Sequence, residues 1–301
     1  MILSRKERIK IDRVDLGTIR RASIGAVFDI LSDGESVSRA KLASMSGLSL
    51  VTVGKAVELL EKAGAVVQQK EVSRAAGRRS SLCCLDRGRS MMIYDFSDAR
   101  RLCTVDILTN ITGNYSLDGA DREEFAQISA QAFFLAASGG ELIGRGLILP
   151  DGCTSDAGFE RQNGGSADIS ESSVRVCALA SAKAGERSSV YFRLDPDLRL
   201  TSCAIISDNR LCRGSTGCAG DVSGFLGVEL IDAARAVCRL MDPEVMRFET
   251  PDGAARERLA ESLCGCGLSA EVDVVVSDHT RAVKGMAKLL IEKWLDELCG
   301  G

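Results

Sequence analysis

The first 64 residues carry apolar positions at the spacing of α-helices. Over 16–31 the apolar stripe falls at helical intervals and ends at a Ser-Asp-Gly turn signal. A shorter helix is predicted over 38–46 with Ser38 as its N-cap, and a third over 50–63 with Ser49 as its N-cap and Gly64 as its stop. The break at 46–49 between these two helices predicts a tight turn.

After Gly64 the period of the pattern changes. The runs 65–67 and 82–85 predict two strands, and the polar segment 68–77 predicts the loop that joins them. Three helices followed by a two-stranded hairpin are typical of a winged helix-turn-helix. In such a unit the second helix of the pair enters the DNA major groove.

The rest of the chain alternates short β-like runs with helical runs, which predicts an α/β body with mixed sheets. The expected strands cover 91–94, 102–107, 142–149, 190–194, 203–206 and 272–276, and the expected helices cover 123–137, 173–184, 228–241, 254–264 and 280–298. We therefore predict a winged helix-turn-helix domain over 1–87 and a second domain over 88–301. The second domain is expected to form two lobes that divide near residue 195.

Charge separates these two parts. Residues 1–90 hold 17 Lys and Arg against 10 Asp and Glu, a balance of +7, within a chain whose net charge is −4. A basic head on an acidic body is typical of a nucleic-acid-binding head joined to a regulatory or assembly domain. A composition of 45% hydrophobic and 27% charged residues fits a globular protein and excludes a disordered or collagen-like chain.

The sequence predicts a cytoplasmic protein without a membrane partner. No apolar run reaches the length of a membrane span, and the charged N-terminus does not read as a secretory signal. The 12 cysteines are scattered through apolar stretches, which favours buried free thiols in a reducing compartment over a disulfide framework.

Several residues of the head are candidates for DNA contact. In the helix over 50–63 the side chains expected to point away from the core are Ser49, Leu50, Thr52 and Lys55, with Ala56 at the margin. Lys55 can meet a phosphate or a guanine edge, Thr52 can bond either, and Leu50 can pack on a thymine methyl group. Arg39, at the start of the preceding helix, and the hairpin arginines Arg74, Arg78 and Arg79 complete the set, since arginines on a hairpin suit phosphates or a narrow minor groove.

The head sequence SRAKLASMSGLSLVTVGKAVELLEKAGAV and the hairpin GRRSSLCCLD resemble the amino-terminal part of the ROK family (repressors, open reading frames and kinases). Segments such as GRGLILPDG and ISDNRLCRGSTGCAGDVSG resemble, in the family's order, its sugar-kinase-like domain over most of 91–301. The resemblance implies an actin-like, ribonuclease H-like sugar-kinase fold of two lobes behind the winged helix-turn-helix.

The family's kinase chemistry is missing from the matching positions. Glycine-rich turns that hold ATP phosphates are replaced by Asp95-Phe96-Ser97-Asp98 and by 195–200, and the Asn-Asp pair that supplies the general base matches Ser172-Ser173. The family's Ala-Gly-Glu-x-Gly-His segment is present as 219–224 without its histidine. Asp221 there is still able to accept a hydrogen bond from a sugar hydroxyl.

These departures predict a body without catalytic residues, bound metal or cofactor. The family's cysteine-rich zinc loop is absent, and neither Cys264-Gly265-Cys266 nor the pair Cys212 and Cys218 has a matching second half for tetrahedral zinc. The single histidine, His279, precedes the last helix and is expected to cap it or lie on the surface.

The sequence thus predicts a DNA-binding transcriptional regulator, a repressor, with a degenerate body for dimerisation, ligand sensing or both. Its expected partners are double-stranded DNA, a second copy of the chain and a sugar-like effector. The alternatives are an active ATP-dependent sugar kinase with an appended head, and a protein-interaction scaffold. A dimer seam can come from the apolar helices over 228–241 and 280–298, which include Leu289, Leu290, Ile291, Trp294 and Leu295, although the same residues can also fill the core.

Overall fold

The computed structural model describes residues 16–70, 81–98, 100–137, 141–153, 167–183, 185–222, 224 and 227–300. Its internal contacts divide the chain into two compact units, one of Met1–Asp86 with Lys293–Gly301 and one of Arg87–Glu292. The predicted division placed residues 293–301 in the second domain. They belong instead to the first unit, because the last helix, α9 (His279–Gly300), starts in the second unit and ends in the first.

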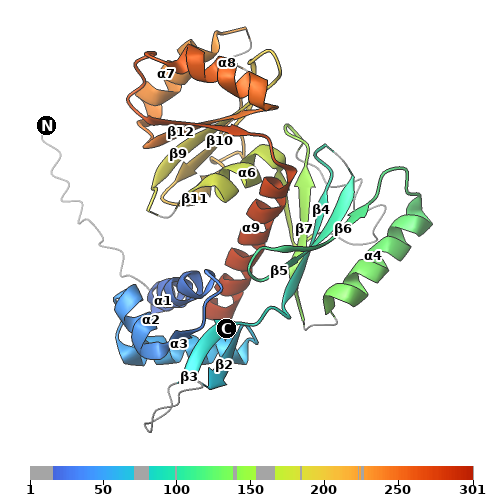
Figure 1. Ribbon diagram of the computed structural model, residues 1–301, viewed down its shortest axis with the longest axis vertical. Coiled ribbons are helices and arrows are strands. Elements are labelled where there is room, and N and C mark those ends of the chain that lie inside the picture. The colour runs from blue at the N-terminus through green and yellow to red at the C-terminus, as the bar shows by residue number, and fades with distance from the viewer. Residues whose placement is uncertain are drawn as a thin grey trace, which may run out of the picture. The chain divides into compact units, whose positions relative to one another are not determined.

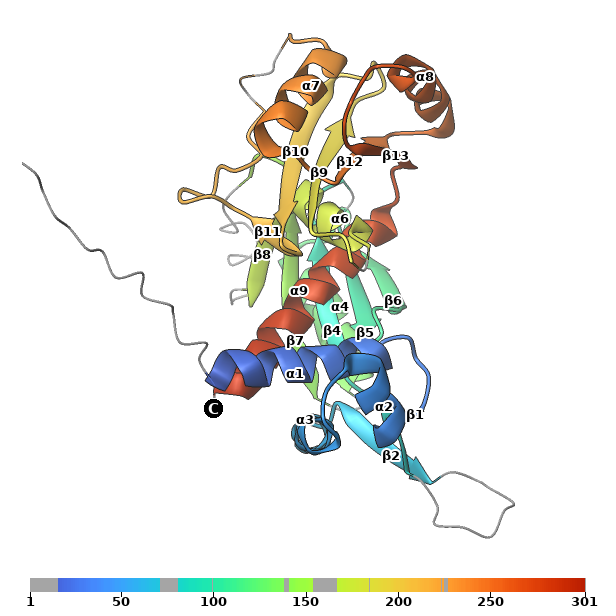
Figure 2. The same ribbon diagram turned by 90° about the vertical axis from the view of Figure 1, so that its left-hand side faces the viewer.

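The first unit contains three helices and a three-stranded antiparallel sheet of order β1-β3-β2 (Figure 2). Its elements, apart from the end of α9, are α1 (Leu16–Leu31), β1 (Val37–Ser38), α2 (Arg39–Ser46), α3 (Leu50–Lys62), β2 (Val66–Lys70) and β3 (Ser81–Leu85). The three helices and the hairpin follow the predicted order. β1 is an addition: it pairs with β3 through Val37 and Cys83, and two residues are too few for a readable alternation.

The core of the first unit is built from the apolar stripes of its helices. Each helix contributes side chains that are almost completely buried: Ile24, Val27, Phe28, Leu31, Leu42, Val53, Ala56, Val57 and Leu60. Burial of these aliphatic groups is the main force that holds three short helices together, because helices of this length are marginal in isolation.

The second unit contains two five-stranded mixed sheets (Figure 1). The first sheet has the order β6-β5-β4-β7-β8, in which β4, β5 and β6 are antiparallel and β4, β7 and β8 are parallel. Its strands are β4 (Ser90–Asp95), β5 (Arg101–Asp106), β6 (Ile111–Ser116), β7 (Leu142–Leu149) and β8 (Ile169–Ser172).

Helices pack on both faces of this first sheet. On one face, Phe125 and Ala132 of α4 (Arg122–Ala137) join Tyr94 and Leu147 in a buried cluster. On the other face, α9 crosses β7 at Gly146, where an added Cβ would overlap the side chain of Met286. The glycine is needed there because the helix approaches the strand too closely for any side chain.

The second sheet has the order β11-β10-β9-β12-β13, with β9, β12 and β13 parallel and β9, β10 and β11 antiparallel. Its strands are β9 (Ser188–Leu194), β10 (Leu200–Ser207), β11 (Arg210–Cys212), β12 (Val245–Thr250) and β13 (Glu271–Val276). Side chains of α7 (Leu230–Met241) and α8 (Gly253–Leu263) bury the core on one face (Figure 1). Contacts of β9 and β10 with α6 (Ser173–Ser181) complete this lobe.

Two expectations about the body need correction. Residue 195 falls in the turn between β9 and β10, which are neighbours in one sheet, so the chain passes between the sheets earlier, over 173–187. Four of the five apolar residues of α9 considered for a dimer seam are buried inside this chain: Leu289, Leu290, Ile291 and Leu295. For these four the core interpretation is the right one.

Candidate functional site

Helices α2 and α3 each begin with a serine N-cap, and the turn between them begins at Gly47. Ser38 Oγ accepts a hydrogen bond from Lys41 N over 3.3 Å, and Ser49 Oγ accepts one from Thr52 N over 3.1 Å. Gly47 ends α2 in the left-handed conformation, with φ of 69°. These are the N-caps and the stop that the sequence predicts, and they set the directions of the two helices.

One side of α3 is buried and the other faces solvent. Val53, Ala56, Val57 and Leu60 are buried, so Ala56 belongs to the inward stripe rather than to the outward margin where the sequence analysis placed it. The exposed side begins with Leu50 and Val51, which are 60% and 69% exposed, and continues with Lys55 and Glu58.

The predicted contact residues of α3 lie together at its N-terminal half. Ser49 and Thr52 are linked by a 2.8 Å hydrogen bond between their hydroxyl groups, so each keeps only part of its bonding capacity for another molecule. Lys55 is exposed one turn further along. The described residues of α3 include two exposed lysines: Lys55 lies in the N-terminal half of the helix and Lys62 is its last residue.

Arg39 lies at the start of α2, where the sequence places it, but its side chain has a partner inside the first unit. Its guanidinium is 3.8 Å from the Glu61 carboxylate, and the two side chains are only about one-third and one-quarter exposed. The arginine thus ties the start of α2 to the end of α3, which makes it a bracing residue of the first unit.

The hairpin arginines Arg74, Arg78 and Arg79 lie outside the described residues. The strands on either side are described: β2 and β3 pair in continuous antiparallel register from Val66 with Leu85 to Lys70 with Ser81.

Two residues of the exposed face were missed from the sequence. The exposure of Val51 could have been inferred from the buried residues of α3, because a residue opposite Val53, Ala56 and Leu60 on the helix must face outward. Gly54 has open space where its Cβ would lie, with no protein atom within 4 Å. Its signal was a glycine in the middle of an otherwise regular helix.

In the second unit, the turn that follows β4 uses its own backbone donors internally. Phe96 N donates to the Ile148 carbonyl over 2.9 Å, and Ser97 N donates to Asp95 Oδ1 over 3.0 Å. Asp95 is fully buried and is also paired with Arg101. The N–H groups of Phe96 and Ser97 are thus bonded to other protein atoms.

The turn between β9 and β10 is closed in the same way. Asp195 Oδ1 accepts hydrogen bonds from Asp197 N over 2.9 Å and from Arg199 N over 2.8 Å, and the Asp195 carbonyl accepts one from Leu198 N. In both turns an aspartate carboxylate accepts backbone hydrogen bonds, so a phosphate bound to the same N–H groups would have to displace a carboxylate of the same charge.

A buried polar network joins the two sheets of the second unit. Arg193 of β9 donates to Asp151 over 2.8 Å, to Glu249 over 2.7 Å and to Ser173 over 3.1 Å. Ser173 matches the family's general-base position, and its hydroxyl here accepts a hydrogen bond from an arginine.

The network is extended by Arg281 of α9, which donates to Glu249 and to the hydroxyl of Tyr191. Burial raises the pKa of Tyr191 well above its usual range, so this hydroxyl stays protonated. Burial alone would lower the pKa of Arg193, but the charges of Glu249 and Asp151 outweigh it and raise the pKa. Two arginines thus face two carboxylates in this network.

Asp221 is exposed and follows a loop that is held onto the body. Arg175 donates to the carbonyls of Gly217 and Ala219, and it is itself paired with Glu171 over 3.2 Å. Asp221 N donates to the Cys218 carbonyl over 3.0 Å. The loop backbone is therefore fixed up to Asp221.

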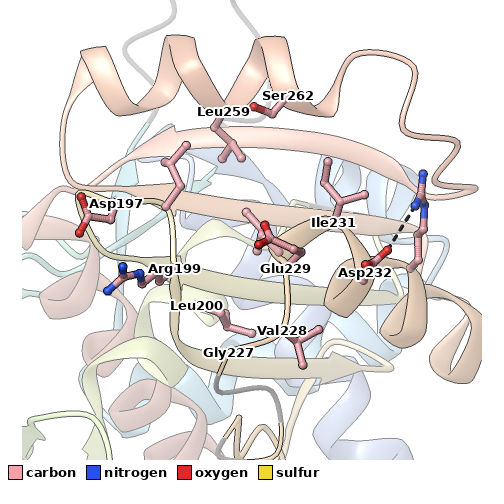
Figure 3. Close-up of a pocket in the computed structure, with 13 residues that line it drawn as sticks. Asp197, Arg199, Leu200, Gly227, Val228, Glu229, Ile231, Asp232, Leu259 and Ser262 are labelled. Carbon is pink, nitrogen blue, oxygen red and sulfur yellow. Dashed lines mark hydrogen bonds and ion pairs between the residues drawn. The ribbon is translucent and has the colours of Figure 1, made fainter.

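A pocket of about 1030 Å³ lies on the second sheet beside α7 and α8 (Figure 3). Apolar side chains of Leu198, Leu200, Leu230 and Leu259 line it, and Asp232 on its rim is 3.3 Å from Arg235. Asp221 is not among its lining residues. The pocket and the family's sugar position are thus different places in this unit.

Neither a metal cluster nor a disulfide is found in the part of the chain that the structure describes. Five cysteines are buried as expected of free thiols, namely Cys83, Cys103, Cys177, Cys203 and Cys238, whereas Cys153, Cys218 and Cys264 are exposed. Within the described ranges, no single helix is long and apolar enough to cross a membrane. The pair α2 and α3 reaches that length and composition only jointly, across a bend of 113°.

No protein-family model matches the sequence, and no curated protein matches it. Solved structures do. A ROK family transcriptional regulator, described as a homolog of the E. coli Mlc protein, aligns with a TM-score of 0.59 at 15% identity over 93% of this chain and 98% of its own. A Listeria monocytogenes protein provisionally assigned as an N-acetylmannosamine kinase aligns with a TM-score of 0.48 at 12% identity, over 68% of this chain and 99% of its own.

The first of these similarities extends over nearly the whole of both chains. It shows that this chain has the mixed α/β fold of a ROK family transcriptional regulator. The resemblance predicted from the sequence is therefore confirmed for the fold.

Proposed function

From the fold shared with a ROK family transcriptional regulator, we propose that this chain belongs to that family and is a DNA-binding regulator, a repressor, without kinase activity. The observation that carries the proposal is the exposed side of α3 at its capped N-terminal half. A helix held behind a tight turn, with its outer face free and a basic residue on it, is the arrangement that enters a major groove.

We assign the first unit as a winged helix-turn-helix. Helices α2 and α3 form the pair, and β2 and β3 form the stem of the wing. Arg74, Arg78 and Arg79 fall between these strands and supply cations for phosphates or a narrow minor groove. Lys55, Thr52, Ser49 and Leu50 face the bases. The excess positive charge of the first 90 residues supports the same partner.

The body, in this proposal, does not phosphorylate a sugar. Support comes from the two turns in which Asp95 and Asp195 use the backbone donors, and from Ser173, whose hydroxyl is bonded to Arg193. An assay with ATP and a panel of hexoses tests this part, and turnover above the no-enzyme rate would overturn it.

The body instead provides dimerisation, effector sensing or both. Two heads related by a two-fold axis read a palindrome, which one small head cannot do with high specificity. Asp221 is our candidate for binding a hydroxyl of a sugar-like effector. A regulator that binds chromosomal DNA acts where that DNA is, so we place the protein in the cytoplasm.

The DNA-binding proposal is tested with duplexes selected by the protein from a random pool, followed by fluorescence anisotropy at two salt concentrations. We expect the affinity to fall steeply with salt, because cations of the protein replace counterions of the phosphates. Lys55→Ala is expected to lower affinity about 5- to 10-fold and to reduce the salt slope by about one.

Lys62→Ala is the matched control, since it removes the same charge from the C-terminal end of α3. It is expected to leave the affinity within about twofold. Failure to enrich any duplex would overturn DNA binding and favour the protein-interaction alternative. Equal effects of Lys55→Ala and Lys62→Ala would remove the N-terminal half of α3 from the interface.

A further inference from the structure

The exposed side of α3 is unusual in chemistry for a helix that reads bases. Its sequence, LVTVGKAVELLEK, contains no arginine, asparagine, glutamine or histidine. These side chains, with lysine, make most of the hydrogen bonds to purine edges in the major groove. Lys55 alone is left for that role on the N-terminal half, because Thr52 is partly engaged with Ser49.

Apolar groups take the place of hydrogen-bonding groups. Leu50 and Val51 are among the most exposed large apolar side chains described, at 60% and 69%. Adjacent residues at a helix start, both turned to water, leave a concentrated apolar surface that no described residue covers. In the major groove the apolar feature of the bases is the thymine methyl group.

Gly54 points independently to a close partner on the same side of the helix. It lies three residues after Val51 and four after Leu50, so the three positions adjoin on the helix surface. Glycine in a helix interior is less favourable than alanine. The described residues do not require it, since an added Cβ would meet none of their atoms within 4 Å apart from the neighbouring residues and the backbone of its own helix. A glycine that internal packing does not need has a role when the surface of another molecule must approach the helix backbone closely.

Glu58 limits the contact to this half of the helix. It follows Gly54 by one turn, is exposed, and would face the phosphates of a duplex if the whole helix lay in the groove. When only the N-terminal half of α3 enters the major groove, the Glu58 carboxylate stays at the edge of the contact.

We infer that α3 reads thymine methyl groups: Leu50 and Val51 contact consecutive thymines, and the bare backbone at Gly54 lets the helix lie deep in the major groove. The inference rests on the proposed DNA binding and adds what the DNA must contain. The half-site is expected to have a thymine-rich step at the point where α3 enters.

The first test replaces single thymines of the selected duplex by deoxyuridine, which removes only the 5-methyl group and keeps the base pairing. Wild-type protein is expected to lose about 3- to 10-fold in affinity at each contacted thymine. The variant Leu50→Ala with Val51→Ala is expected to bind the thymine duplex more weakly and to show no further loss with deoxyuridine, because its contact is already gone.

The second test is Gly54→Ala, which is expected to raise the melting temperature and lower the affinity for the selected duplex at least 10-fold. If Gly54→Ala is more stable than wild type but binds DNA more weakly, the loss of affinity comes from blocked close approach and not from misfolding. Gly25→Ala is the control: it makes the same change in α1, where the neighbour of an added Cβ is the flexible end of Arg21. Its affinity for DNA is expected to stay at the wild-type value.

The outcomes of these tests distinguish this inference from the proposed DNA binding on which it rests. The inference would be overturned if replacing thymine by deoxyuridine left the salt-dependent affinity unchanged, or if the Gly54→Ala variant bound as tightly as wild type. Either result would leave the proposed DNA binding unaffected. Absence of any salt-dependent duplex binding would overturn both.

Discussion

Arg193 on β9 and Asp151 at the end of β7 are joined by a 2.8 Å hydrogen-bonded ion pair that links the two sheets of the second unit. Each side chain is about one-fifth exposed, and the Glu249 carboxylate that shares the arginine is almost fully buried. Arg193 also donates to Ser173, which the family resemblance matches to the general-base position. The two arginines and two carboxylates of this network balance in charge, and we therefore interpret the network as structural.

Replacing Arg193 is therefore expected to destabilise the second unit strongly. Arg193→Met leaves the partly buried Asp151 without its arginine and the buried Glu249 with Arg281 alone, and should lower the free energy of unfolding by about 3–5 kcal/mol. Arg193→Lys keeps the charge but loses the forked geometry, so its loss should be smaller. Urea unfolding followed by circular dichroism measures both, and equal losses would show that charge compensation is not what the arginine supplies.

The buried pair of Arg247 and Glu186 predicts a dependence of stability on pH. Arg247 is 2% exposed and donates two 2.7 Å hydrogen bonds to the Glu186 carboxylate. Burial alone would raise the pKa of Glu186, but hydrogen bonds from Arg247 and Ser189 outweigh it and hold the pKa below its ordinary value. Asp273 lies on the other side of Arg247, at 3.2 Å, and Lys183 faces Asp273.

A depressed folded-state pKa means that Glu186 stabilises the fold above its unfolded pKa and that this contribution is lost as the pH falls through the folded value. Glu186→Gln should lower the free energy of unfolding by about 3–5 kcal/mol at pH 7. The difference from wild type should shrink below about pH 4, where the wild-type carboxyl also becomes neutral. Urea titrations at pH 7, 5 and 3.5 measure this, and a constant difference would contradict the linkage.

Local signals allowed the first unit to be predicted closely. Ser38, Ser49, Gly47 and Gly64 act within a few residues of their own positions, so caps and turns could be read without knowing the tertiary contacts. Arg39 could not be placed in the same way. Its partner Glu61 lies 22 residues later, and only the packing of α2 on α3 brings the two together.

In the body, strand β12 escaped prediction for a related reason. All six of its residues are buried, yet two of them, Arg247 and Glu249, are charged. A strand buried on both faces is expected to read as a continuous apolar run. Partners from β9, β13 and the segment before β9 neutralise these charges, and no pattern within β12 reveals them.

The cysteines are expected to separate into two groups by reactivity. Burial raises the pKa of Cys177 and Cys203 to about 12 and that of Cys103 to about 11. The thiolate is the reactive form, so at pH 8 these three should resist iodoacetamide. Cys153 and Cys264 are exposed and should be modified first.

Mass spectrometry of peptides from a labelling time course measures the order of modification. The same reaction in 8 M urea is the control, because unfolding should make all cysteines react at similar rates. Labelling of Cys177 in the native protein as fast as Cys153 would contradict its burial.

The end of α9 supplies a buried side chain to the first unit. Leu295 is 3% exposed, and its neighbour Asp296 forms an ion pair with Arg21 of α1. The side chain of Asp296 is about two-thirds exposed, so water screens most of that attraction. The unit is therefore held to the C-terminal residues chiefly by apolar burial.

Leu295→Ala is accordingly expected to lower the free energy of unfolding of the first unit by about 2–4 kcal/mol, because it removes buried methyl groups and leaves a cavity. Hydrogen exchange of peptides from α1 and α3, read by mass spectrometry, should show faster exchange in this variant. Asp296→Ala is the control on the adjacent residue, and its exchange should stay close to wild type. Faster exchange in Asp296→Ala than in Leu295→Ala would mean that the ion pair with Arg21, rather than burial of Leu295, couples the last turns of α9 to the first unit.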